Sequence, residues 1–127
     1  MKRRKTALFL IQFLSVVLLC ANVAFANKAS VSIEAPAEVA KGTEITIRLT
    51  VDHNADNVFH HVEWVEIKVN NNQVGYWKFS TFDLPPAAKF TKEIKYTVTE
   101  NTEIRAEASC NLHWSAGPGF FKIAVKE

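Results

Sequence analysis

Residues 44–51 read Glu-Ile-Thr-Ile-Arg-Leu-Thr-Val, and their pattern indicates the fold class. Polar and apolar side chains alternate without a break, so an extended strand here would have one apolar and one polar face. Outward from this stretch, the same period of two recurs and no helical period appears. The other stretches are residues 31–35, 62–69, 74–79, 90–98, 104–108 and 120–125. The pattern therefore predicts an all-β domain of about seven strands.

Turn-forming residues separate these stretches. Asn70-Asn71-Asn72 stands between two of them and predicts a β-hairpin, and Gly117-Pro118-Gly119 precedes the last one. About seven short strands in about 100 residues are typical of an immunoglobulin-like β-sandwich. We expect the larger aromatic residues to lie in its core: Phe79, Phe82, Phe90, Tyr96 and Phe120.

The first 26 residues have the layout of a secretory signal peptide. Four basic residues at positions 2–5 precede an apolar stretch over residues 6–19, and Ala24-Phe25-Ala26 offers small residues where a signal peptidase reads them. We expect cleavage before Asn27, which leaves one domain over residues 27–127 in the periplasm or outside the cell. A membrane anchor is the competing interpretation, because the apolar run is nearly long enough to span a bilayer. The export route, general secretory or twin-arginine, stays open.

Cleavage also changes the charge balance. The leader carries four of the 15 basic residues and none of the 13 acidic ones, so 11 basic and 13 acidic residues remain, a formal net charge of −2. No strongly basic surface is then left, and we do not expect a nucleic-acid partner. We also expect no membrane contact once the leader is removed.

All four histidines and the one cysteine of the mature chain fall at strand ends or in loops. His53 closes one predicted strand, His60 and His61 open the next, and Cys110 and His113 follow a third. A Cys-x-x-His turn can place a thiolate and an imidazole on one ion. Such ligands suit iron, zinc or copper and argue against calcium or magnesium. The spacing predicts a metal site and leaves the metal open.

Two motifs resemble one known family. Residues 60–67, His-His-Val-Glu-Trp-Val-Glu-Ile, resemble the His-(His/Tyr)-Ile-x-Trp-Ile-x-Leu segment of superoxide reductases, the desulfoferrodoxin and neelaredoxin family. Residues 110–113, Cys-Asn-Leu-His, resemble its Cys-Asn-x-His motif, and residues 33–42 are similar to its N-terminal region. The resemblance covers nearly all of the mature chain. It implies a sandwich that holds one mononuclear non-haem iron and reduces superoxide to hydrogen peroxide.

The resemblance also implies a ligand set. Carried over by motif, His53, His60 and His113 would be equatorial iron ligands and Cys110 the axial one, with a further position open to superoxide. The axial thiolate would make the metal more reactive toward a bound oxygen species.

Other roles follow from the same resemblance. His61 matches a position that is not a ligand, so we expect it beside the site, together with Asn111. Main-chain amides after Cys110 are expected to hydrogen-bond the sulfur. The family's superoxide-attracting lysine aligns with Lys28. Because the chain has no four-cysteine module, electrons would come from a separate donor protein.

Three positions depart from the family pattern. The family's first histidine aligns with Ala29, so the fourth imidazole is missing. The interval from His53 to His60 is one residue longer than in the family, and Trp114 stands where a glycine normally follows the second motif. The first departure bears on catalysis more than on metal binding.

Two other functions fit the same residues. Four donors suit a closed tetrahedral zinc site in a structural or carrier domain without redox catalysis. Alternatively, the sandwich binds a partner, and Cys110 serves as a redox or attachment thiol.

Overall fold

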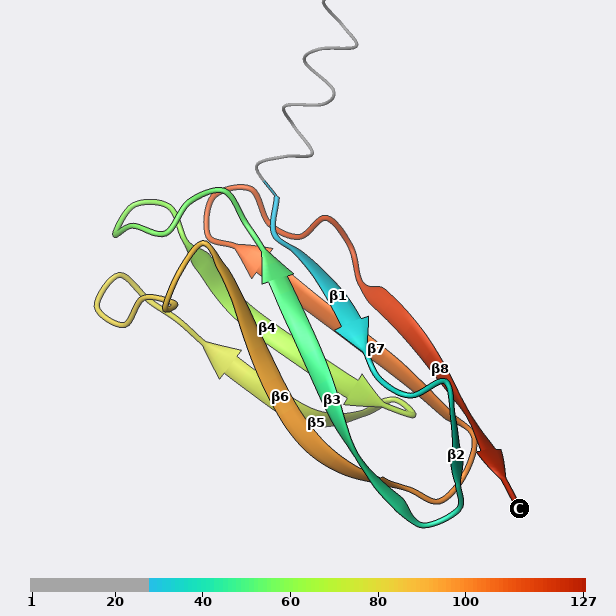
Figure 1. The fold of residues 1–127 in the computed structure, drawn as a ribbon. Helices are drawn as coiled ribbons and strands as arrows, with labels where there is room; N and C mark the ends of the chain where they lie inside the picture. Colours follow the sequence, from blue (N-terminus) through green and yellow to red (C-terminus); the bar gives the residue numbers. More distant parts are fainter. Residues whose placement is uncertain (1–27) are drawn as a thin grey trace, which may run out of the picture.

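The computed structural model describes residues 28–127, which form eight strands and no helix (Figure 1). The strands are β1 (Ser30–Glu34), β2 (Glu38–Ala40), β3 (Thr43–Asp52), β4 (Val62–Val69), β5 (Asn72–Lys78), β6 (Lys89–Val98), β7 (Thr102–Cys110) and β8 (Gly119–Lys126). The predicted signal peptide, residues 1–26, and its cleavage site lie outside the described residues. Within residues 28–127 there is no helix with the length and hydropathy needed to span a bilayer.

The strands form two sheets, with the orders β1-β3-β6 and β2-β8-β7-β4-β5. β3 is the central strand of the smaller sheet and pairs antiparallel with β1 and with β6. The alternation in residues 44–51 has the predicted effect, since its four apolar side chains are buried between the sheets: Ile45, Ile47, Leu49 and Val51. The prediction of an all-β, two-sheet sandwich is confirmed.

The structure adds one strand to the seven expected. β2 has three residues and pairs in parallel with β8 at the edge of the larger sheet. Its pattern is too short to show a period, so it owes its strand conformation to its partner. The predicted hairpin is confirmed: β4 and β5 pair antiparallel, and Asn70 and Asn71 turn between them with φ angles of 49° and 68°.

The expectation that five aromatic residues lie in the core was wrong for two of them. Phe90 is buried, and Phe79 and Tyr96 pack partly buried against the core. Phe82, however, is 99% exposed in the connection between β5 and β6, and Phe120 is 59% exposed. Phe120 shares its strand face with the exposed Lys122, because Phe121 and Ile123 occupy the inward positions of β8.

Candidate metal centre

Two strands, one from each sheet, deliver His53 and Cys110 to the same end of the sandwich. His53 is two residues beyond the buried Val51 of β3, and Cys110 is two residues beyond the buried Ala108 of β7. Both therefore continue the inward-facing row of their strand, since side chains two apart share a face. β3 and β7 end at the same end of the molecule in Figure 1. The apolar core is therefore bordered at this end by a histidine and a thiol.

His60 and His113 approach the same point from two loops. His60 lies just before β4, whose first residue, Val62, pairs with Cys110. His113 lies in the turn after β7, which is closed by reciprocal backbone hydrogen bonds between Cys110 and Trp114. The Cys-x-x-His turn expected from the sequence is therefore present, and the structure brings the four predicted ligands together.

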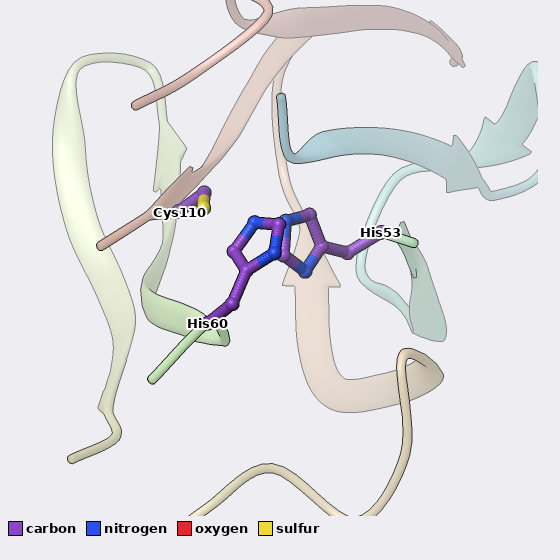
Figure 2. A group of neighbouring side chains, drawn as sticks. All are labelled: His53, His60 and Cys110. Carbon is purple, nitrogen blue, oxygen red and sulfur yellow. The ribbon is translucent and has the colours of Figure 1, made fainter. Parts of the chain in front are cut away.

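The donor atoms converge closely. His53, His60 and Cys110 each offer one atom, and these atoms all lie within 4.8 Å of one another (Figure 2). The His113 Nδ1 atom lies 3.2 Å from His60 Nε2 and 3.8 Å from Cys110 Sγ. The His53 and His60 rings meet edge to face with centroids 4.7 Å apart, and those of His60 and His113 are 4.9 Å apart.

A single hydrogen bond of the His53 ring indicates which of its nitrogens is available to a metal. Nδ1 lies 2.8 Å from the carbonyl oxygen of Ala55, which can only accept, so Nδ1 carries the proton. In the neutral ring Nε2 then holds the lone pair, and this atom is buried without a hydrogen-bond partner. A buried polar atom left unpaired costs about 1–3 kcal/mol, and a metal ion at this point would remove that cost.

The surroundings of His60 favour its neutral imidazole, the form that binds a metal, because they lower its pKa. Burial lowers the pKa of His60 from its ordinary value of 6.5, and the neighbouring His53, His113 and His61 lower it further. The three neighbours act because their positive charges would repel a protonated His60. Nε2 of His60 and Nδ1 of His113 face each other, so an ion could take a lone pair from both.

The sulfur of Cys110 has the surroundings of a metal ligand rather than of an attachment thiol. Cys110 is fully buried, and the backbone N–H of Leu112 donates to Sγ at 3.4 Å. An amide directed at sulfur stabilises negative charge on it. Such an amide after Cys110 was expected from the sequence. The burial disfavours the alternative in which Cys110 attaches a partner or cargo.

His61 and Asn111 lie beside the donor atoms. His61 is buried, and its Nδ1 lies 3.0 Å from the carbonyl oxygen of Asn57, so its ring is engaged by the loop. The side chain of Asn111 contacts Cys110 Sγ at 3.8 Å and also bonds to the backbone of Phe59 and His61. Sequence reasoning missed Asn57, whose only sequence signal is an asparagine in a short polar loop.

The position of the missing histidine lies at this end too. The β1–β3 ladder ends at the pair Ser30–Asp52, so Ala29 and His53 are each the next residue beyond that pair, and Ala29 forms an isolated parallel bridge with Ser115. Ala29 is fully buried, and its backbone bonds to Trp114 and Ala116 in the loop after β7. Lys28 precedes it and is partly buried; its role in attracting superoxide stays a prediction.

The donor set fits a transition metal. Three imidazole nitrogens and one buried cysteine sulfur are donors that iron, zinc and copper accept, and no carboxylate joins this group among the described residues. The comparison with known families agrees, because residues 22–116 match the model described as desulfoferrodoxin. The chain belongs to the desulfoferrodoxin family. The family resemblance inferred from the two motifs is thereby confirmed.

Solved structures of this family share the fold of the chain. The superoxide reductase (neelaredoxin) from Ignicoccus hospitalis is 21% identical with a TM-score of 0.66, over 78% of this chain and 82% of that one. A putative superoxide reductase from Thermotoga maritima is 22% identical with a TM-score of 0.58, over 76% and 86%.

The fold also occurs outside the desulfoferrodoxin family. The sulfur carrier protein SoxY from Chlorobium limicola reaches a TM-score of 0.59 at 10% identity, over 76% of this chain and 79% of that one. At such identities the likeness shows a common fold, so the function has to be argued from the site. No curated protein matches the chain significantly.

Proposed function

We propose that this desulfoferrodoxin-family chain holds one mononuclear non-haem iron and reduces superoxide to hydrogen peroxide. The observation that carries the proposal is the meeting of His113 Nδ1 with His60 Nε2 at 3.2 Å and with Cys110 Sγ at 3.8 Å, beside the unpartnered Nε2 of His53. These four atoms would hold the iron. When bound, iron supplies the one electron that, with two protons, converts superoxide to hydrogen peroxide.

The protein's own groups prepare the site for an anion. Neutral imidazoles add no charge, and the Leu112 amide offsets part of the thiolate charge through its hydrogen bond. Lys28, directly before the buried Ala29, would attract superoxide to this end of the molecule. Its replacement by glutamine should slow the reaction and weaken its dependence on ionic strength, without changing the metal content.

We infer that the electron comes from another protein. Cys110 is the one cysteine of residues 28–127, so this part of the chain offers no ligands for an iron–sulfur cluster beside the proposed iron. A separate donor protein would reduce the site once per superoxide consumed.

The direct test of function is the stoichiometry of superoxide removal by the iron-loaded protein. Reduction by a donor should give one hydrogen peroxide for each superoxide and release no oxygen. Dismutation would give one peroxide for every two superoxide ions, with oxygen. A loaded protein that consumes superoxide no faster than free buffer would contradict the proposal.

A zinc-binding structural or carrier domain is the second candidate. The observation in its favour is the number of donors, because three histidines and one cysteine complete a tetrahedral zinc site without an open position. A closed site would stabilise the fold and give no superoxide reaction.

We further propose that the protein is exported to the periplasm or beyond the cell. The support is the basic and apolar leader and the small residues Ala24 and Ala26. Mass spectrometry of the protein from the exported fraction should find Asn27 as its first residue. A chain that begins at Met1 and stays with the membrane would favour the anchor interpretation instead.

A further inference from the structure

The main chain around His60 is held almost entirely by two asparagine residues. His60 lies outside the β4 ladder, which begins at Val62. All six backbone donors and acceptors of Phe59, His60 and His61 nevertheless have partners. Every one of those partners belongs to Asn57 or Asn111.

Asn57 binds this segment from the loop side. Its Oδ1 accepts hydrogen bonds from the amides of Phe59 and His60, both at 3.0 Å. Its backbone N–H donates to the carbonyl oxygen of His60 at 2.9 Å, and its carbonyl oxygen accepts from the His60 amide at 3.2 Å. Asn57 therefore sets the curvature of the chain that enters His60.

Asn111 binds the same segment from the other side, next to Cys110. Its Nδ2 donates to the carbonyl oxygen of Phe59 at 3.1 Å, and its Oδ1 accepts from the amide of His61 at 3.0 Å. These backbone partners fix the orientation of the amide, because a flipped side chain would set donor against donor and acceptor against acceptor. The backbone N–H of Asn111 also donates to the carbonyl oxygen of His61 at 3.1 Å.

We propose that Asn57 and Asn111 are positioning residues that fix His60 in the metal centre, an inference that rests on the proposed function. Asn111 directly follows Cys110, so its bonds to Phe59 and His61 tie the segment that supplies an imidazole to the segment that supplies the sulfur. The two asparagines hold the geometry before metal arrives. Without them the segment would exchange these bonds for water, and His60 would have to be ordered at the moment of binding.

The test uses the whole mature protein and cobalt(II) as a spectroscopic probe, whose thiolate charge-transfer band reports the Cys110 bond. Replacing a residue that orients a metal ligand typically costs about 10–100-fold in affinity. We expect Asn57→Ala and Asn111→Ala each to weaken cobalt binding by about that factor. Asn57→Asp should bind cobalt with close to wild-type affinity, because a carboxylate oxygen accepts the same two amide hydrogen bonds.

The matched control is Asn101→Ala. Asn101 Oδ1 accepts from the amide of Val125, which is the same kind of side-chain-to-backbone bond, placed between β6 and β7 away from the site. This variant should lower the urea midpoint and leave the cobalt affinity and spectrum unchanged. In metal-free protein, Asn57→Ala should speed hydrogen exchange at the amides of Phe59 and His60, and Asn111→Ala at that of His61.

The outcomes separate this inference from the proposed function. A wild-type protein that binds no cobalt would remove the metal centre, and with it any positioning role for the two asparagines. The inference would be overturned if both alanine variants bound cobalt with wild-type affinity and spectrum, and only their urea midpoints fell, as expected for Asn101→Ala. The metal centre itself would not be affected by that result.

Discussion

Trp114 adopts a backbone conformation that large L-amino acids rarely occupy. Its φ is 61°, in the left-handed region, and its side chain is 72% exposed. The sequence comparison had marked this position as one where the family pattern has glycine, and the positive φ gives the physical reason. The chain retains the conformation because the Trp114 backbone closes the Cys110 turn and accepts a hydrogen bond from Ala29.

Trp114→Gly should therefore stabilise the protein. The left-handed conformation costs a residue with a side chain about 1–2 kcal/mol, and the added freedom of glycine in the unfolded chain returns about 0.4–1 kcal/mol of that. We expect a modest rise in the urea midpoint. Leu112→Gly is the control, because Leu112 is also exposed in this turn but does not have a positive φ; it should lower the midpoint. A fall of equal size in both variants would contradict the strain at Trp114.

Ala29 offers a way to add the imidazole that the site lacks. Ala29 and His53 are each the next residue beyond the last β1–β3 pair, and the Ala29 amide donates to the carbonyl oxygen of Trp114 in the turn that carries His113. Ala29→His should tighten cobalt binding by about tenfold or more, equivalent to ~1.4 kcal/mol, and move the spectrum toward a higher coordination number. Ala29→Leu, which adds bulk to the same buried position without a donor, should destabilise the fold and bind cobalt no more tightly. Equal affinities in the two variants would place position 29 outside the reach of the metal.

The lowered pKa of His60 should make the stability of the metal-free protein depend on pH. Its pKa in the folded protein is lowered below 6.5, first by burial and then by His53, His113 and His61. The unfolded chain therefore takes up this proton at a higher pH, and stability falls as the pH drops below about 6.5 toward the lowered value. Above that range neither state is protonated and the contribution is constant. We expect the urea midpoint to fall from about pH 7 to pH 5, and to fall less in His60→Gln. Equal falls would contradict the lowered pKa.

At the scale of elements, period-two alternation was enough to locate seven of the eight strands within one or two residues at most ends. Residues 44–51 were predicted as strand and form the centre of β3, and Cys110 and His53 take their inward direction from the same rule. β2 could not be found this way, because its partner β8 determines its conformation. The hydrogen bonds by which Asn57 and Asn111 position His60 could not be predicted either. The two asparagines are distant in sequence, and no sequence pattern links them.

The hairpin between β4 and β5 depends on residues that tolerate positive φ. Asn71 has a φ of 68°, so Asn71→Val should lower stability by about 1–2 kcal/mol, whereas Asn71→Gly should preserve or raise it. Gln73→Val tests a neighbouring exposed residue of β5 without positive φ, and a β-branched residue is tolerated there. The measurement is the urea midpoint of each variant. If valine at position 71 lowered the urea midpoint no more than valine at position 73, the turn would not be what sets the β4–β5 register.

At the scale of the molecule, the sandwich brings three segments that are distant in sequence together in one site. His53 directly follows β3, His60 lies just before β4, and Cys110 is the last residue of β7 (Figure 2). His113 joins them from the turn after β7. The sequence alone could nominate these residues, because every histidine and the cysteine of the mature chain stood at a strand end or in a loop next to one. It could not show that His53 Nε2 is buried without a partner, since this depends on the three-dimensional path of the loop at Ala55.

The identity of the bound metal and its bond to sulfur decide between the reductase and the zinc domain. The protein should be purified from the cells that make it, its metal quantified, and the visible spectrum of its oxidised form recorded beside that of Cys110→Ser. We predict close to one iron per chain and a thiolate-to-ferric charge-transfer band that is lost in the variant. One zinc per chain with no visible band would contradict the reductase function and make the domain a structural or carrier module.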